Sequence, residues 1–405
     1  MSATTASLSL YHLLEPDVLA CPYPLYQQLR EEDPVHWDPY LHAWIVTRYA
    51  DVVTVLQQFL GSRTPSPEKL SALGLEHLVP IARVMVKQML FLDPPAHGRI
   101  RRPAASAFTP RRVELLREHI CQIADALVDC AVAKGAMEVM ADFANPLTTI
   151  VTAEMFGLAT DDRSRLKSWS EDFAEMLGNF QHNPGRATNA LRSLEEMTSY
   201  FREVTRRQAS WPGEGLVGCL AAAEVDGDRL TEDEVVANLI VTMVGGLETT
   251  TNLIGNGLLT LLRHPDDLQR LREDFSLIPT AIEELLRYES PSQHTARLVP
   301  EALDLEGKHL MKGDAVIAVM GAANRDPEHY PDPDHLDIAR SENRHLAFGW
   351  ATHHCFGAPL ARLEAQVAFE TILRRLPDLR LSPGPITWRP NLGLRGLSAL
   401  NVDIS

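Results

Sequence analysis

The sequence predicts a single, mainly α-helical domain with small β-sheets, spanning residues 1–405. Apolar residues three and four positions apart dominate from about residue 97 to 290, which is the spacing of one helix face. Strand and turn signals gather nearer both ends of the chain, in 35–48, 295–320 and 378–404. Since no repeat or long linker separates these regions, we expect one compact unit.

The expected elements follow in order along the chain. We predict a helix at 23–32 (YPLYQQLREE), strands at 35–40 and 43–48 joined by a turn around 40–42, a helix at 50–59 and a loop-rich segment at 61–95. A strand, DAVIAVM, follows the turn residues Lys312–Gly313. A helix after Cys355 should bury a stripe formed by Leu360, Leu363, Val367, Ile372 and Leu376.

Composition argues against several classes of protein. The formal net charge is −16 at pH 7, whereas a nucleic-acid-binding face is basic. Five widely spaced cysteines favour a reducing compartment over a disulfide framework. The N-terminal residues lack the basic start and apolar run of a signal peptide, and the apolar stretch at 235–247 is too short to cross a bilayer. We therefore expect a cytoplasmic protein without a membrane span.

Cys355 lies in a glycine-bearing loop directly before a strong helix, in AFGWATHHCFGAPLAR. Pro359 suits the first turn of that helix. The unpaired N–H groups and positive dipole at a helix N-terminus lower the pKa of a thiol, and a thiolate can act as a nucleophile or a metal ligand. Two other interpretations stay open: a buried, inert cysteine, and a zinc site that uses His353, His354 and Cys355.

A long helix is predicted from Thr231 to about 262, because Thr231 and Glu234 form a capping box. Its middle, GGLETT at 245–250, is unusual, since glycine is a poor helix former and an acid interrupts an apolar run. Thr249 can donate a hydrogen bond to the carbonyl of Gly245 and open the helix there. The segment is either a functional site or a packing point with a solvated acid.

Glu284 and Arg287, in AIEELLRY, are three residues apart and can pair on one helix face. From the spacing alone, most such pairs are solvated surface bridges of little energetic value.

The cysteine segment resembles a known signature. Phe348-Gly349-x-x-x-His353-x-Cys355-x-Gly357, followed by APLAR, is similar to the haem-binding motif of the bacterial cytochrome P450 family. The resemblance implies that family's fold, a triangular and mainly helical prism with haem between the oxygen-activation helix at 231–262 and the helix after the cysteine loop. It also implies that Cys355 is the proximal thiolate of the iron, a ligand that favours O–O cleavage.

The resemblance assigns roles within this loop. Phe348 would pack beside the sulfur, Gly357 would let the backbone approach the haem, and His353 would reach a propionate. The family usually has a glycine where this chain has Ala351. A methyl group fits there if the backbone is not left-handed.

Charged groups elsewhere match the family in chain order. His97 and Arg101, four residues apart on one helix face, and Arg297 would bind the haem propionates. The Glu–Arg pair in AIEELLRY would be buried behind the haem and locked by Arg340, forming a structural network of Glu284, Arg287 and Arg340.

The unusual stretch in the long helix resembles the family's acid–alcohol pair. Thr249 would hydrogen-bond bound oxygen, Glu248 would relay protons from bulk water, and Gly245 would leave space beside the cofactor. Because peroxide-driven relatives replace these groups, their presence favours activation of O2 with electrons supplied from outside.

The resemblance also places a substrate pocket among 61–92, 170–190, 239–246, 292–296 and 391–395. Its mainly apolar character suits a hydrophobic molecule, although about half of the chosen residues would be plain core. Gln293, His294 and Asn391 could orient an oxygenated substrate. The residues chosen are Met89, Phe173, Met176, Leu177, Leu239, Val241, Met243, Gln293 and Leu392.

The implied function is that of a haem b (iron protoporphyrin IX) monooxygenase that hydroxylates or epoxidises a polyketide- or terpenoid-like secondary metabolite. Alternatives are a fatty-acid or steroid hydroxylase, a haem-thiolate catalyst of peroxide-driven, desaturating or coupling reactions, and a haem sensor or carrier.

No fused reductase is expected, because the chain has neither a dinucleotide-binding motif nor clustered cysteines. Electrons would come from NAD(P)H through a separate ferredoxin or flavodoxin with its reductase, and the protein would be a monomer. A local basic patch could bind such an acidic partner, formed by Arg101, Arg102, Arg111, Arg112, Arg362, Arg374 and Arg375.

Overall fold

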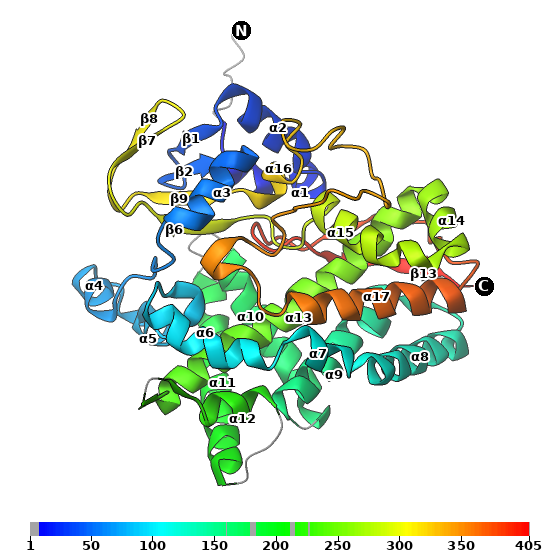
Figure 1. Ribbon diagram of the computed structural model, residues 1–405, viewed down its shortest axis with the longest axis horizontal. Helices are drawn as coiled ribbons and strands as arrows, with labels where there is room; N and C mark the ends of the chain where they lie inside the picture. The colour runs from blue at the N-terminus through cyan, green and yellow to red at the C-terminus, as the bar shows by residue number, and fades with distance from the viewer. Residues whose placement is uncertain (1–7, 159, 179–183, 211–214, 226, 405) are drawn as a thin grey trace.

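Helices form most of the protein, with the strands β1, β2, β6, β7, β8 and β9 together on one side and β13 on the other side, near the C-terminus (Figure 1). The computed structural model describes residues 8–158, 160–178, 184–210, 215–225 and 227–404. Its α-helices are α1 (Pro16–Ala20), α2 (Tyr23–Glu32), α3 (Tyr49–Gln58), α4 (Pro67–Ala72), α5 (Val79–Met85), α6 (Ala96–Ser106), α7 (Pro110–Glu114), α8 (Arg117–Lys134), α9 (Asn145–Phe156), α10 (Arg163–Gly178), α11 (Pro184–Ser210), α12 (Leu216–Ala221), α13 (Glu232–Arg263), α14 (Pro265–Glu273), α15 (Ile278–Tyr288), α16 (Met320–Ala323) and α17 (Ala358–Arg375).

The largest sheet combines two strands from near the N-terminus with two strands from residues 295–318. Its strand order is β1-β2-β9-β6, with β2 and β9 parallel and the other neighbours antiparallel. The remaining strands form short antiparallel pairs or a small three-stranded sheet. The strands are β1 (Val35–Asp38), β2 (Ala43–Val46), β3 (Met137–Glu138), β4 (Glu224–Val225), β5 (Asp228–Arg229), β6 (Thr295–Leu298), β7 (Leu303–Leu305), β8 (Lys308–Leu310), β9 (Ala315–Ala318), β10 (Arg380–Leu381), β11 (Thr387–Trp388), β12 (Leu397–Ala399) and β13 (Asn401–Asp403).

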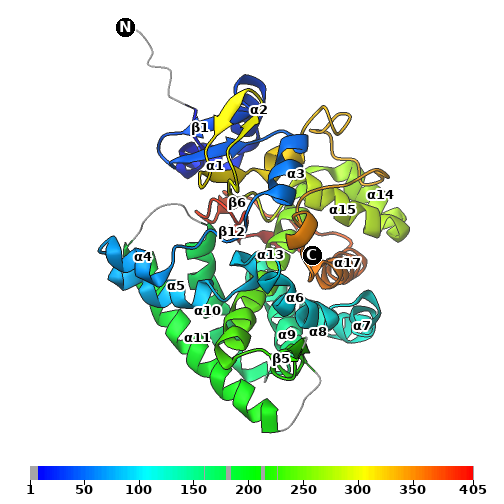
Figure 2. The same ribbon diagram turned by 60° about the vertical axis from the view of Figure 1, so that its left-hand side comes forward.

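Helix α13 crosses the centre of the molecule (Figure 2). The predicted capping box is confirmed, since Thr231 Oγ1 accepts from the N–H of Glu234 at 3.3 Å and Glu234 Oε2 accepts from the N–H of Thr231 at 2.8 Å. The helix contacts α9, α10, α11, α12, α15 and α17. Because neighbours surround it, α13 is apolar on nearly every face, as a fully buried helix should be.

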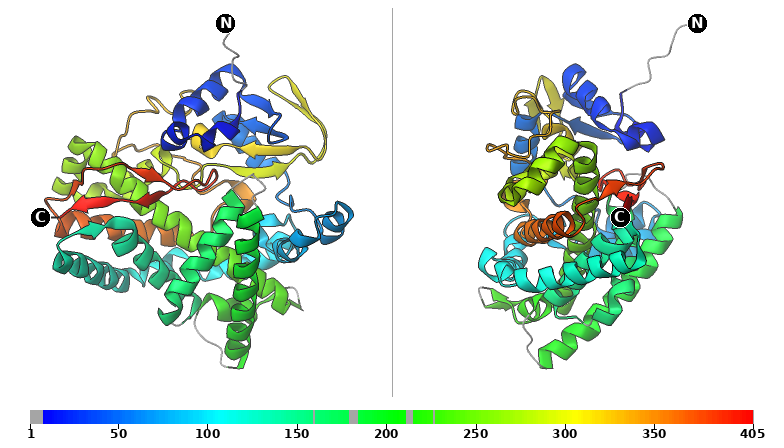
Figure 3. Two further views of the ribbon diagram at one scale, coloured as in Figure 1. Left: turned by 180° about the vertical axis from the view of Figure 1, so that it is seen from behind. Right: turned by 90° about the vertical axis from the view of Figure 1, so that its right-hand side faces the viewer.

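Helix α17 packs beside α13 and α15, and the loop containing Cys355 precedes it (Figures 1 and 3). Pro359 lies in its first turn as predicted. All five residues of the predicted stripe are buried. This packing fixes the start of α17, and therefore the cysteine loop, against the central helix.

The expected helices and strands between 23 and 59 are confirmed. The segment 61–95 is less loop-like than predicted, because α4 and α5 form within it and the side chain of Ser66 caps α4 by accepting from the N–H of Lys69. Residues 179–183, within the predicted pocket segment, lie outside the described residues. No described helix is both long and apolar enough to cross a bilayer.

Candidate active site

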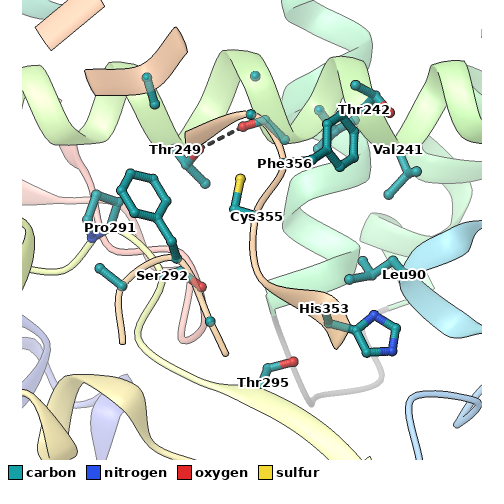
Figure 4. A pocket seen from close by; sticks show the side chains of 18 of the residues that line it. Leu90, Val241, Thr242, Thr249, Pro291, Ser292, Thr295, His353, Cys355 and Phe356 are labelled. Atoms are coloured by element: carbon teal, nitrogen blue, oxygen red, sulfur yellow. Dashed lines mark hydrogen bonds between the residues drawn. The ribbon is translucent and has the colours of Figure 1, made fainter. Parts of the chain in front are cut away.

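A cavity of about 390 Å³ lies between α13 and the loop before α17. Figure 4 shows Cys355 pointing into it, toward the stretch of α13 that contains Thr249. Most of its lining side chains are apolar, among them Met89, Leu90, Leu177, Val241 and Leu394. The cavity therefore brings the cysteine and the unusual stretch of α13 to one space.

The cysteine loop is held by backbone hydrogen bonds. The N–H of Cys355 donates to the carbonyl of Phe348 at 2.8 Å, and a Cβ at Gly357 would lie 3.7 Å from the sulfur. The Cys355 side chain is exposed to the cavity, and desolvation by the protein atoms around it raises the pKa of the thiol, although the N–H groups of Gly357 and Ala358 act against this. Desolvation therefore acts against the lowered thiol pKa that was expected from the helix terminus. A coordinated metal would reverse this balance, since a metal-bound thiol is deprotonated.

Ala351 departs from expectation. Its φ is +53°, in the left-handed region, so the condition for fitting a methyl group without strain is not met. A non-glycine residue in that conformation costs about 1–2 kcal/mol. Its neighbour Gly349, at φ +70°, adopts the same region without that cost.

The middle of α13 has the predicted irregularity. The hydroxyl of Thr249 donates to the carbonyl of Gly245 at 2.7 Å, drawn as the dashed line in Figure 4. A Cβ at Gly245 would meet nothing within 4 Å, whereas one at Gly246 would lie 3.1 Å from the hydroxyl of Thr152 on α9. Gly245 therefore leaves open space in the cavity, and Gly246 allows close helix packing.

Glu248 is buried at 1% exposure, and it is absent from the lining of the cavity. Its carboxylate forms ion pairs with Lys167 on α10 at 2.8 Å and with Arg389 at 2.6 Å, and Ser170 donates to it at 3.1 Å. Burial acts to raise the pKa of Glu248, but these two cations outweigh it and hold the pKa below its ordinary value. In this conformation Glu248 is an ionised bridge between α13 and α10.

Basic side chains gather on the side of the cavity near β6. The predicted residues His97, Arg101, Arg297 and His353 all line it, and Arg63 joins them, which the sequence reasoning missed. His97 Nε2, His353 Nε2 and Arg297 Nε are buried without a hydrogen-bond partner among the described residues.

The basic side chains near β6 form a site that favours the binding of an anion. Burial and neighbouring Arg297, His97 and Arg63 lower the pKa of His353 to about 3. Burial lowers the pKa of Arg297 to about 10. Unsatisfied buried donors beside crowded cations fit the carboxylates of a cofactor such as haem, and Cys355 in the same cavity fits its iron. No group of three or more His, Cys, Asp and Glu side chains in the described part of the chain is arranged to hold a metal ion by itself.

The Glu284–Arg287 pair is a buried lock rather than a surface bridge. Both side chains have 0% exposure, and two nitrogens of Arg287 donate to the two oxygens of Glu284 at 2.8 Å. Arg340 also donates to both oxygens at 3.2 Å, and the Asn343 side chain adds a further donor at 3.0 Å. The predicted three-residue network is present, and every oxygen in it is satisfied.

The predicted substrate residues divide into two groups. Met89, Leu177 and Val241 line the cavity. The others do not: Phe173, Met176, Leu239 and Met243 pack in the main core, Leu392 packs in the core near α2, and the amide of Gln293 donates to the carbonyl of Ser290.

Two of the residues wrongly assigned to the pocket lie on the face of α13 that points away from the cavity. Leu239 and Met243 are one turn apart on a face that packs against neighbouring helices, whereas Val241, Thr242 and Gly245 face the cavity. Of the polar candidates, His294 lines the cavity and Asn391 donates to the carbonyl of Ala174 instead.

Glu364 on α17 is a buried acid that the sequence reasoning missed. It lines the cavity at 2% exposure, and its Oε2 has no partner among the described residues. Burial raises the pKa of Glu364 well above its ordinary value and so favours the protonated acid. The available signal was an acid on the predicted buried face of α17, since Glu364 lies four residues after Leu360 and three before Val367.

The predicted basic patch is only partly free. Arg362 pairs with Glu283, and Arg374 and Arg375 pair with acids on α8 and α17. Arg101 donates to the carbonyl of His354. Of the seven arginines predicted for this patch, those that stay exposed and enter no ion pair between described residues are Arg102, Arg111 and Arg112.

Comparison with known proteins adds three likenesses. The family profile described as Cytochrome P450 matches residues 66–377. The chain is 38% identical over 389 residues to the "Biotin biosynthesis cytochrome P450" of Bacillus subtilis, covering 95% of this chain and 97% of that protein. It is 39% identical over 416 residues to the "Cytochrome P450 monooxygenase PikC" of Streptomyces venezuelae, covering 98% and 95%.

Among solved structures, P450BioI in complex with a hexadec-9Z-enoic acid ligated acyl carrier protein matches with a TM-score of 0.91 at 36% identity, covering 96% of this chain and 99% of that chain. This match confirms the fold expected from the sequence.

Proposed function

The chain belongs to the cytochrome P450 family, and we propose that it hydroxylates or epoxidises an oxygenated, mainly apolar small molecule of the polyketide or terpenoid kind. Membership makes it a haem-dependent monooxygenase, an oxidoreductase of the class found in bacterial secondary metabolism. The observation that carries the substrate proposal is the largely apolar cavity that reaches both Cys355 and Thr249.

Haem b fits this cavity, and its iron supplies the binding and reduction of O2. Cys355 provides the thiolate ligand, and Phe348 lines the cavity beside it. His97, Arg101, Arg297 and His353 line the cavity and would hold the propionates, and the unpartnered nitrogens of His97 and His353 would be available to them. These groups orient the cofactor and neutralise its carboxylates without reacting.

Thr249 and Glu248 have different tasks. The Thr249 hydroxyl donates to Gly245, so its oxygen can accept a hydrogen bond from a water or substrate group in the cavity. Glu248 relays protons only after its carboxylate leaves Lys167 and Arg389, because it does not line the cavity while it is paired. Turnover therefore includes a step in which those ion pairs open.

Thr242 supports an oxygenated substrate. Thr242 lies in the cavity lining, and its buried hydroxyl has no partner among the described residues, although a helical threonine commonly donates to the carbonyl four residues before it. Thr242 precedes Thr249 by two turns, so a substrate group held there lies roughly 10 Å along α13 from the reacting end. This spacing suits a molecule with a polar group well separated from the oxidised carbon.

A carrier-bound acyl chain is the second candidate substrate. The likeness to P450BioI, whose structure contains an acyl carrier protein, favours it. An apolar cavity accommodates an acyl chain as well as a macrocycle or terpenoid.

Electrons come from NAD(P)H through a separate ferredoxin or flavodoxin with its reductase. Arg102, Arg111 and Arg112 are exposed, and they supply a positive surface for an acidic partner. The five free cysteines suit the reducing cytoplasm, where these partners are found.

A ligand screen on the purified holoenzyme tests the substrate class. Candidate polyketides, terpenoids and fatty acids are titrated, and the haem absorbance reports displacement of the water ligand. Thr242→Val should weaken the binding of an oxygenated ligand by up to about tenfold, the value of one hydrogen bond. Its deoxy analogue, as the control, should bind both proteins equally. Equal weakening of both ligands, or of neither, would remove Thr242 from substrate recognition.

A further inference from the structure

Arg63 lies between α3 and α4 and lines the cavity beside the haem-binding cations. Its Nη1 donates to the carbonyls of Gly61 at 3.1 Å and Leu90 at 3.3 Å, and its guanidinium lies 4.5 Å from the centre of the Phe91 ring. No acid among the described residues forms an ion pair with it. These contacts use one of its terminal nitrogens and leave donors for another partner.

The charges around this part of the cavity do not balance. Arg63, Arg101 and Arg297 all line it, and the single described acid in that lining is Glu364, whose pKa burial raises well above its ordinary value. Asp93 is the acid that interacts with Arg63 and Arg297. Its oxygens already accept from the N–H groups of Gly61 and Ser62 and from the Ser62 hydroxyl. Three arginines against one carboxylate leave an excess of two positive charges.

A haem carries two propionates, and both are ionised at neutral pH. Their charge equals this excess, whereas the predicted pair of arginines, Arg101 and Arg297, would leave one charge too few once Asp93 is counted. Guanidinium groups bind carboxylates through paired charge-assisted hydrogen bonds, and a desolvated cation without a counter-ion is costly. The charge balance therefore points to Arg63 as part of the haem site.

We propose that Arg63 is a third arginine partner of the haem propionates, and that it links the cofactor to the cavity wall through Leu90 and Phe91. This inference rests on the haem site described above. The competing occupant for the same guanidinium is a carboxylate of the substrate. The match of charges favours the propionates, because they use up the whole excess.

Arg63→Gln tests the proposal, since glutamine removes the charge and keeps hydrogen-bonding capacity. The matched control is Arg83→Gln, because Arg83 is exposed on α5 and enters no ion pair between described residues. The resonance Raman bands of propionate bending are recorded on each holoenzyme. The transfer of haem to an excess of apomyoglobin gives its rate of loss.

We expect Arg63→Gln to shift a propionate band and to speed haem loss roughly ten- to a hundredfold, the effect of losing a hydrogen bond to a charged group. Arg83→Gln should match the wild type in both measurements. Arg63→Lys, which keeps the charge without the planar fork, should lie between them. If the glutamine variant does not accumulate as holoenzyme, the same two measurements on the lysine variant decide the question.

Unchanged bands and haem loss in the Arg63 variants would overturn the proposal. So would weaker binding of a long-chain fatty acid with unchanged haem retention, because that result assigns Arg63 to a substrate carboxylate. Failure of the proposed function would look different: the wild type itself would show no thiolate-ligated haem.

Discussion

Two glutamates of this protein are equally buried and equally paired with two cations, yet they lie in different surroundings. Glu284, at 0% exposure, pairs with Arg287 and Arg340 behind the cysteine loop. Glu248, at 1%, pairs with Lys167 and Arg389 beside the cavity. The side chains of Arg287 and Arg340 are 0% and 11% exposed, whereas those of Lys167 and Arg389 are 16% and 19% exposed.

This difference separates a fixed lock from a bridge that can open. The carboxylate of Glu284 also accepts from Asn343 and from the N–H of Asp337, so releasing it would strand several buried donors. The cations of Glu248 reach water at their edges and can be solvated when the pairs separate. The first glutamate should therefore control folding and haem retention, and the second should control proton supply.

The largest effect is expected from Arg287→Ala, which breaks the fixed lock. An unpaired buried Glu284 should cost about 3–5 kcal/mol of stability, with loss of haem from the purified protein. The matched control is Arg270→Ala, which removes another arginine paired with an acid three residues before it, here on the surface. It should cost under about 1 kcal/mol. Similar unfolding free energies for the two variants would contradict the distinction.

Thr249→Ala should separate chemistry from stability on the cavity side. Removing this hydroxyl should lower NADPH-linked product formation by about a hundredfold, within the range for a group that assists proton transfer. Haem content and the unfolding midpoint should change little. Product formation driven by added hydrogen peroxide, measured on the same variant, serves as the control. A variant that keeps full NADPH-linked activity would indicate a peroxide-driven enzyme.

Glu248→Gln tests the bridge through its pH dependence. The lowered folded-state pKa means that ionised Glu248 contributes stability above its ordinary pKa of about 4.3, and that this stability is lost as pH falls through the lower value. The wild type should exceed the variant by about 1–3 kcal/mol at pH 7, and the gap should close below pH 4. The variant should retain haem. If the difference in unfolding free energy between the wild type and the variant did not depend on pH, the ionisation of Glu248 would not be the source of this stability.

Ala351→Gly should have the smallest effect, and it tests strain in the cysteine loop. Relief of the left-handed conformation gains about 1–2 kcal/mol, and the greater freedom of glycine in the unfolded chain costs about 0.4–1 kcal/mol. A net stabilisation of about 0.5–1 kcal/mol is expected from chemical denaturation. Destabilisation would mean that the methyl group makes a contact worth more than its strain.

The fixed side of the molecule was far easier to predict than the cavity side. The pairing of Glu284 with Arg287 and the capping box of α13 follow from local spacing. The burial of that pair, and its contact with Arg340 56 residues away, were predicted only from the resemblance to the cytochrome P450 family. One carbonyl that accepts from Arg63, that of Leu90, lies 27 residues away in the sequence. The two cations that pair with Glu248 lie 81 and 141 residues away. No local pattern encodes such distant contacts.

The remaining errors concern the backbone conformation of Ala351 and the face of α13 that borders the cavity. The left-handed φ of Ala351 is imposed by the loop around it and not by alanine's own preference. The wrong residues of α13, Leu239 and Met243, were chosen because an all-round apolar helix carries no mark of which face borders a cavity.

The central claim is that the sulfur of Cys355 ligates haem iron in this cavity. It is tested most directly by reducing the purified holoenzyme under carbon monoxide and recording its absorbance. The account predicts the red-shifted Soret band of a haem with an anionic sulfur ligand, and its loss in Cys355→Ser. A folded, haem-loaded wild type without that band, or a serine variant that keeps it, would contradict the account.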